Sequence, residues 1–263
     1  MYASWRAEKF LVFLQALASF LILFIVVPLA ALFLRFEPST AHEIFSSPEL
    51  ASQVRSAFIT SLTASAVAVL ALSVLGVPLA YILARTSFRG KTLLESIIDI
   101  PLVMPHAVAG IMILTAYSRR GLLGGLVSGL GLRVQDSFTG IVLAMMFVSA
   151  PLLVDTVKAG IAEIDPMLEA VARTLGASRA RVFIDIVLPM AWRHVLAGAI
   201  LAWARALSEV GALLIVAYYP MTINILIIQY LNIYGLGYAV VLSALFAAFA
   251  IGLFAALRLV IRK

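Results

Sequence analysis

The sequence predicts an all-α polytopic membrane protein. Hydrophobic residues make up 63% of its 263 residues and charged residues only 12%, about half the charge of an average soluble domain. A hydrocarbon core about 30 Å thick is crossed by about 20 apolar residues in a helix. Six apolar stretches have about that length, residues 10–34, 56–84, 100–118, 138–154, 194–218 and 237–260.

The first stretch follows two basic residues, Arg6 and Lys9. Its apolar run is longer than the core of about 7 to 15 residues found in secretory signals. We therefore expect a retained membrane span rather than a cleaved signal.

Basic residues set the expected orientation, because Lys and Arg in short loops resist translocation. With both termini inside, five basic residues lie outside: Arg35, Arg55, Arg119, Arg120 and Arg133. Thirteen lie inside: Arg6, Lys9, Arg85, Arg89, Lys91, Lys158, Arg173, Arg179, Arg181, Arg193, Arg258, Arg262 and Lys263. The excess predicts cytoplasmic N- and C-termini.

Composition also excludes several functions. The net charge of +6 reflects membrane orientation, so we expect no nucleic-acid binding. The absence of cysteine excludes disulfides and thiolate chemistry. His42, His106 and His194 are far apart in sequence and are expected to be lone polar residues, so we expect no metal site and no catalytic site.

We predict two parts. Residues 1–55 hold the N-terminal transmembrane helix and an external loop, and residues 56–263 form a core domain. Residues 119–137 form a second, glycine-rich external loop, and the longest cytoplasmic excursion, at about 155–193, is the most highly charged.

Within that excursion the residues predict a helix, a turn and a second helix. Asp165 can cap a helix that has Pro166 at its first position, and Gly176 can end it in a left-handed conformation. Ser178 can cap the next helix, which Pro189 ends or joins to the following span.

Both helices are amphipathic. The first carries Leu168, Val171 and Leu175 on one face and an expected pair of Glu169 with Arg173 on another. The second opposes apolar to charged side chains: Val182, Phe183 and Ile186 against Arg181 and Asp185. Short helices need a surface to pack on, so the loop either lies on the bilayer surface or docks a soluble partner.

This loop resembles the cytoplasmic EAA loop of ABC importer permeases, whose pattern is E-A-A-x3-G-x9-I-x-L-P. Gly176 is followed after nine residues by Ile186, Leu188 and Pro189. The first half departs from the pattern, since the sequence there is Glu169-Ala170-Val171, with alanine at the usual glutamate position.

The resemblance implies coupling helices that insert into a separate ATPase subunit. The residues it implicates are Glu169, Ala170, Arg173, Gly176, Ala177, Ser178, Arg179, Arg181, Val182 and Phe183. The chain itself lacks a phosphate-binding loop, because Arg89-Gly90-Lys91-Thr92 has Arg85 where a glycine is needed and follows a membrane helix rather than a strand.

Two further segments resemble permeases of the molybdate and tungstate branch, with the sulfate branch as a near relative. They are ARTSFRGKTLLESIIDIPLVMPHAVAG at 84–110 and WARALSEVGALLIVAYYP at 203–220. The branch pattern R-A-L-x-E-F-G-A is matched from Arg205 to Ala212 except at Val210. The resemblance covers about residues 56–263 and implies six transmembrane helices of the type I ABC importer permease fold, in a homodimer.

Charges inside a membrane indicate pairing or a polar cavity, since one alone costs at least about 2.5 to 3.5 kcal/mol. Arg205 and Glu209 lie one helical turn apart and are expected to pair, either as a structural clamp or, with Ser208, as pathway or gate residues. Pro101 and Pro105 each lack a backbone N–H donor, so the helix that contains them can bend. The bend could serve as a gate or only as packing, and the sequence favours neither.

The resulting hypothesis is the non-enzymatic transmembrane subunit of an ATP-driven molybdate or tungstate importer in a prokaryotic cell membrane. It works by alternating access, with two copies of an ATPase subunit that bind ATP and magnesium, and with an external oxyanion-binding protein. The chain itself needs no cofactor. The alternatives are a sulfate or thiosulfate ABC permease and an ion-coupled secondary transporter, which would leave residues 165–189 without a role. A membrane enzyme is disfavoured, since no nucleophile, base and metal converge.

Overall fold

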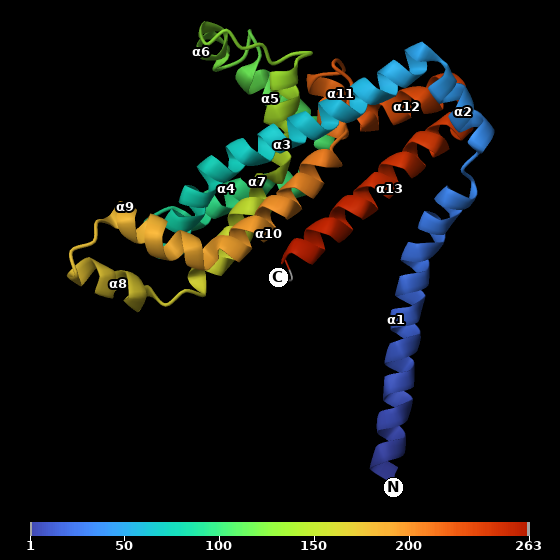
Figure 1. Ribbon diagram of the computed structural model, residues 1–263. Helices are drawn as coiled ribbons and strands as arrows, with labels where there is room; N and C mark the ends of the chain where they lie inside the picture. The colour runs from blue at the N-terminus through green and yellow to red at the C-terminus, as the bar shows by residue number, and fades with distance from the viewer. Residues whose placement is uncertain (1, 262–263) are drawn as a thin grey trace. The chain divides into compact units, whose positions relative to one another are not determined.

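The computed structural model describes residues 2–261, and it is helical throughout its regular elements (Figure 1). Arg262 and Lys263, on which the predicted orientation partly depends, lie outside the described residues. Five helical runs are long and apolar enough to cross a membrane: Phe10–Leu34, Pro48–Arg85, Phe138–Ala162, Arg179–Leu207 and Leu236–Ala255.

The chain divides into two compact units, Met1–Ala51 with Ile227–Leu253 and Ser52–Leu226 with Phe254–Lys263. The first contains α1 (Tyr2–Leu34), α2 (Pro38–Ser46) and most of α13 (Leu236–Ile261). No residue in the most apolar window of α1 is buried. The segment 35–55, predicted to be external, contains the short helix α2 and the start of the next helix, α3.

The second unit carries the core. Its helices are α3 (Pro48–Arg85), α4 (Lys91–Val103), α5 (His106–Tyr117), α6 (Gly124–Gly129), α7 (Phe138–Ala162), α8 (Pro166–Thr174), α9 (Arg179–Val182), the π-helix η1 (Phe183–Val187), α10 (Leu188–Leu207), α11 (Gly211–Val216) and α12 (Ile223–Tyr234). Of these, α3 begins in the first unit, and α12 contributes only Ile223–Leu226 to the second unit, its remainder belonging to the first.

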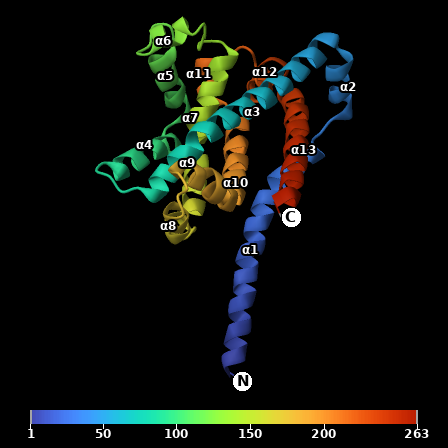
Figure 2. The ribbon, with the colours of Figure 1, turned by 60° about the vertical axis from the view of Figure 1, so that its left-hand side comes forward.

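Helix α7 lies at the centre of the second unit. Its most apolar window is 61% buried, α10 packs along it and α11 packs against α5. Lys158 of α7 also pairs with Glu95 of α4, at 3.3 Å. Figures 1 and 2 both place α8 and α9 at one end of this unit and α6 at the other.

The stretch predicted as a third span, 100–118, is split. Met104 is extended (ψ 137°) and separates α4 from α5, because the ring of Pro105 disfavours helical geometry at the preceding residue. With 12 residues, α5 is about 18 Å long, too short to cross a bilayer alone. Pro105 thus breaks the helix, whereas Pro101 lies buried inside α4.

The predicted fifth span, 194–218, is also interrupted. Helix α10 ends at Leu207 and α11 begins at Gly211. At its other end, α10 continues from α9 through η1 without a break.

Small residues permit the close contact of α7 with α10. A Cβ atom added to Gly160 of α7 would overlap the Cβ and Cγ atoms of His194 on α10, and one added to Gly198 would meet the carbonyl oxygen of Leu153 at 3.2 Å. These helices therefore approach at a distance that only glycine allows.

We expect Gly160→Ala to destabilise the protein by about 1 to 3 kcal/mol through overpacking, measured as chemical unfolding in detergent micelles. Gly252→Ala is the matched control, because its new methyl group meets nothing within 4 Å and should only gain helix propensity. Equal effects of the two substitutions would contradict the packing argument.

Candidate functional site

Local capping residues define the coupling segment, which comprises α8, α9 and η1 (Pro166–Val187). The Asp165 carboxylate accepts from the Met167 amide at 2.9 Å and Pro166 occupies the first turn of α8. Gly176 has φ +90°, and the Ser178 hydroxyl accepts from the Arg181 amide at 3.2 Å. The predicted helix, turn and helix are confirmed.

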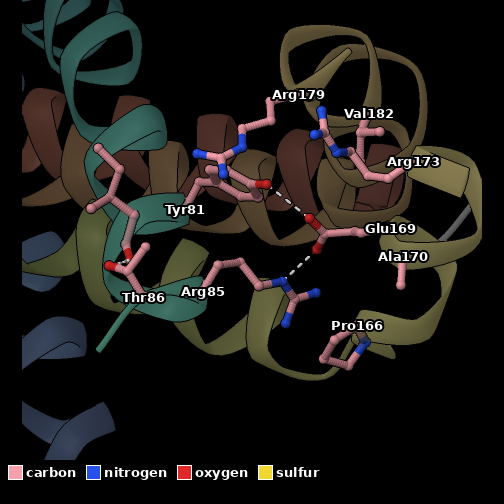
Figure 3. A pocket seen from close by; sticks show the side chains of 10 residues that line it. Tyr81, Arg85, Thr86, Pro166, Glu169, Ala170, Arg173, Arg179 and Val182 are labelled. Atoms are coloured by element: carbon pink, nitrogen blue, oxygen red, sulfur yellow. Dashed lines mark hydrogen bonds and ion pairs between the residues drawn. The ribbon is translucent and has the colours of Figure 1, made fainter. Parts of the chain in front are cut away.

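The polar face of α8 is held against α3 (Figure 3). Glu169 pairs with Arg85 Nε at 2.5 Å and accepts from the Tyr81 hydroxyl at 2.8 Å, while Arg85 Nη2 donates to the Ile164 carbonyl at 2.8 Å. The predicted pair of Glu169 with Arg173 is wrong, because Arg173 instead donates to the Ala177 carbonyl. Glu169 thus connects α8 to α3 within this chain.

The opposite face of α8 is apolar and uncovered. Met167 is 63% exposed, Val171 50% and Leu175 83%, and Leu168 is exposed beside them. None of the α8 residues is buried. A contiguous apolar face of this kind marks an interaction surface.

The implicated coupling residues divide into two groups. Val182 is buried and the Phe183 ring packs on Tyr81 with centroids 4.9 Å apart, so both contribute to this chain's own packing. Exposed residues that remain available to a partner are Ala170, Arg173, Gly176, Ser178, Arg179 and Arg181, with Ala177 half-buried.

Of the two predicted roles of Pro189, ending the second helix is wrong and joining it to the following span is confirmed. The proline lies in the first turn of α10, directly after the π-turn η1, in which the Leu188 amide donates to the Phe183 carbonyl. A proline inside an α-helix removes one hydrogen bond and crowds a carbonyl one turn back. The wider π-turn accommodates this change of register, so the helix continues into α10.

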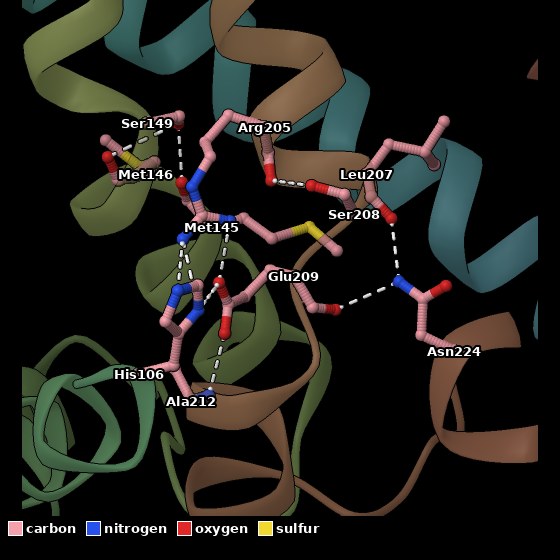
Figure 4. A network of polar contacts seen from close by, with 10 residues as sticks. All are labelled: His106, Met145, Met146, Ser149, Arg205, Leu207, Ser208, Glu209, Ala212 and Asn224. Carbon is pink, nitrogen blue, oxygen red and sulfur yellow. Dashed lines mark hydrogen bonds and ion pairs between the residues drawn. The ribbon is translucent and has the colours of Figure 1, made fainter. Parts of the chain in front are cut away.

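A second cluster, the Glu209 network, lies where α10 gives way to α11 (Figure 4). Glu209 has no exposed side-chain surface, and its Oε2 atom contacts Arg205 Nη1 and His106 Nδ1, each at 2.8 Å. Its Oε1 atom accepts from the Ala212 amide at 2.8 Å. The expected pairing of Arg205 with Glu209 is confirmed.

Asn224 closes the same network. Its Nδ2 atom donates to the Leu207 carbonyl at 2.9 Å and to the Glu209 carbonyl at 3.1 Å. Backbone carbonyls freed by the end of α10 are thereby satisfied. The Ser208 hydroxyl donates to the Arg205 carbonyl and does not join the carboxylate.

His106 is the residue that the sequence reasoning missed. Its ring is 52% exposed and also contacts Arg205 Nη2 at 3.1 Å, so it is not a lone polar residue. Its position directly after Pro105, at a helix start, was the available signal. Pro105 thus adjoins the network, while Pro101 lies within α4. Among the described residues, no group of three or more potential ligands could hold a metal ion.

We expect Glu209 and Arg205 to be energetically coupled. A double-mutant cycle of Glu209→Gln and Arg205→Gln should give a coupling energy of about 1 to 3 kcal/mol, measured by chemical unfolding in micelles. The matched control is Glu163→Gln, since that carboxylate is 72% exposed and meets His194 only at 3.7 Å. Additive effects of the two substitutions would refute the clamp.

Comparisons with known proteins agree with this architecture. The sequence profile of the binding-protein-dependent transport system inner membrane component family matches residues 76–263. The molybdate/tungstate transport system permease protein WtpB of Thermococcus kodakarensis is 42% identical over 255 residues, covering 96% of each chain. The corresponding protein of Pyrococcus abyssi is 42% identical, covering 94% of each chain. A probable sulfate transport system permease protein of Chlorokybus atmophyticus is 32% identical, covering 84% of this chain and 78% of the relative.

Among solved structures, a chain of a bacterial ABC transporter involved in the import of the acidic polysaccharide alginate has a TM-score of 0.72 at 18% identity, covering 97% of this chain and 96% of that one. This likeness supports the fold, and the family match supports the class of protein. The chain belongs to the binding-protein-dependent transport system inner membrane components, the permease subunits of ABC importers, and is a multi-pass membrane protein.

Proposed function

We propose that this chain is the transmembrane subunit of an ATP-driven importer for a tetrahedral oxyanion, molybdate or tungstate. It forms a homodimer, binds two copies of an ATPase subunit and receives the ion from an external binding protein. The observation that carries the proposal is α8, which exposes an apolar face while its polar face is fixed to α3. ATP and magnesium belong to the partner subunit.

The structure supports a mechanical route from α8 to the Glu209 network. Glu169 ties α8 to the end of α3, and the turn at Gly176 leads into a helical run of 29 residues, Arg179–Leu207. At 1.5 Å per residue this run is about 43 Å long, and its far end is the break at Ser208. Movement of the coupling segment therefore reaches that break through one continuous helix.

Alternating access then consists of two positions of this helix relative to α7. ATPase closure would favour one position, and nucleotide release the other. Arg205 supplies positive charge and donors for a passing dianion beside the half-exposed His106 ring, and Glu209 lowers the net charge of the network so that the ion is not trapped.

Six membrane crossings complete the proposal. Helices α4 and α5 together make the crossing that neither makes alone, which places both termini on the cytoplasmic side. The positions of α6 and α8 at opposite ends of the second unit (Figures 1 and 2) support this orientation. We retain the two predicted parts, residues 1–55 and 56–263, as functional regions.

Relatives support the substrate. Permeases named for molybdate and tungstate are up to 42% identical to this chain, and those named for sulfate reach 32 to 34%. Sulfate is therefore the second candidate.

Docking on α8 predicts the result of a co-purification experiment. Val171→Asp with Leu175→Asp should abolish recovery of the ATPase subunit with the detergent-solubilised permease, because two charges would enter an apolar interface. Both side chains are exposed, so thermal unfolding should not change. Leu122→Asp with Leu123→Asp is the matched control on the second external loop. These side chains are 88% and 39% exposed, compared with 83% for Leu175 and 50% for Val171. Undiminished recovery of the ATPase would exclude α8 as the docking site.

Transport itself provides the substrate test. In proteoliposomes that contain the permease, the ATPase and the binding protein, tungstate should accumulate only with ATP, and sulfate in excess should not compete. Competition and accumulation of sulfate would favour the second candidate. Uptake driven by an ion gradient without the ATPase would eliminate an ATP-driven mechanism.

A further inference from the structure

A polar cavity lies between the end of α3 and the coupling segment (Figure 3). Its volume is about 500 Å³, within the range of about 300 to 1,000 Å³ typical of ligand sites. Ten residues line it: Tyr81, Ile82, Arg85, Thr86, Pro166, Glu169, Ala170, Arg173, Arg179 and Val182. Neither the apolar docking face of α8 nor the Glu209 network accounts for this cavity.

Positive charge dominates the cavity. Arg85, Arg173 and Arg179 face a single carboxylate, that of Glu169, which leaves an excess of two positive charges. Lys91 adds a further cation nearby, since its Nζ atom lies 3.2 Å from the carbonyl oxygen of Thr86. The cavity therefore favours an anion.

The arginines differ in how far their donors are used. Arg85 is engaged by Glu169 and the Ile164 carbonyl. Arg173 makes a contact of 3.4 Å with the Ala177 carbonyl, which uses at most one of the five donors of a guanidinium group. Guanidinium groups bind phosphate-type oxygens through paired hydrogen bonds, so Arg173 and Arg179 are the residues equipped to hold such a group.

The cavity and the docking face lie on different sides of α8. At 100° per residue, one side of the helix carries Pro166, Glu169, Ala170 and Arg173. The residues Met167, Leu168, Val171 and Leu175 cluster about 165° away. A protein bound to the exposed apolar face therefore does not need to fill the cavity.

We propose that this cavity binds a tetrahedral oxyanion of the phosphate type, held by Arg173 and Arg179. The group is either the phosphate of a membrane lipid or a free oxyanion in solution. The position of the cavity suits a lipid phosphate, because Arg85 ends a helix long enough to cross the bilayer, and basic pockets at that level bind lipid headgroups. The bound anion would link the arginines of α8 and α9 and stiffen the joint with α3.

Direct binding to the purified full-length chain, without any ATPase, tests the proposal. One arm counts bound phosphatidylglycerol by native mass spectrometry, with diacylglycerol as the probe that lacks phosphate. The other arm measures radiolabelled inorganic phosphate by equilibrium dialysis. Arg173→Gln with Arg179→Gln should weaken binding by about tenfold or more in the arm that shows binding, because charge-assisted hydrogen bonds are lost.

Arg89→Gln with Arg193→Gln is the matched control, since it removes the same charge from two exposed arginines outside the cavity lining. It should change binding by less than about twofold if the paired contacts, rather than general charge, hold the anion. Binding in the lipid arm alone identifies a headgroup site, and binding in the phosphate arm identifies a site open to soluble oxyanions. Equal binding by the variant and the wild type in both arms would overturn the proposal.

A second measurement needs no substitution and so does not depend on the folding of a variant. Whichever probe binds, phosphatidylglycerol or inorganic phosphate, should protect Arg173 and Arg179 of the wild-type chain from modification by phenylglyoxal, while Arg193 stays reactive. Failure of both probes to protect these arginines would also overturn the proposal. Because neither measurement involves transport, their outcome is independent of the proposed importer function.

Discussion

A bilayer offers no water to an interrupted helix, so each freed backbone group must find a partner within the protein. The break between α10 and α11 meets this requirement through two side chains. Glu209 accepts from the first-turn amide of Ala212, and Asn224 donates to the carbonyls of Leu207 and Glu209. The carboxylate that stabilises the break is fully buried, and a buried charge requires a partner of opposite sign. Arg205 is that partner, with its Nη1 atom 2.8 Å from the Glu209 carboxylate, and His106 Nδ1 lies at hydrogen-bond distance from the same oxygen.

This arrangement places a helix break at the end of a long continuous helix. The run Arg179–Leu207 has no interruption, since the π-turn before Pro189 absorbs the one position at which an α-helix would fail. Its near end follows α8 through the turn at Gly176, and α8 is fixed to α3 by Glu169 with Arg85 and Tyr81. Phe183, near the start of the run, also packs on Tyr81. A force on α8 is therefore transmitted along one continuous helix, whose far end packs on α7 and joins the hydrogen bonds and ion pairs of the Glu209 network.

Short-range features could be predicted from the sequence and long-range ones could not. Asp165, Gly176 and Ser178 act within a few residues, so their residue types alone indicated the two helices of the coupling segment. The partner of Glu169 lies 84 residues away on α3, and i,i+4 spacing favoured Arg173 instead. The break at 208–210 carries no proline, and one residue that satisfies its carbonyls, Asn224, lies 17 positions beyond Leu207 on α12. The sixth crossing remains a prediction. Counting apolar residues identifies 100–118 as one span, but it does not detect that Pro105 divides this stretch into two short helices.

The charges near the break bear on both the structural role of Arg205 and its proposed role in transport. An arginine that served only as a clamp would be best buried with its carboxylate, yet its side chain stays 20% exposed and the neighbouring His106 ring stays half-exposed. Glu209 therefore closes the helix break, whereas the partly exposed Arg205 has N–H donors that Glu209 does not use. An anion that approached Arg205 would compete with Glu209 for the same guanidinium, and Glu209 is also the acceptor of the α11 amide. If the proposed pathway passes Arg205, its occupation by an anion and the conformation of the break would be coupled through one carboxylate.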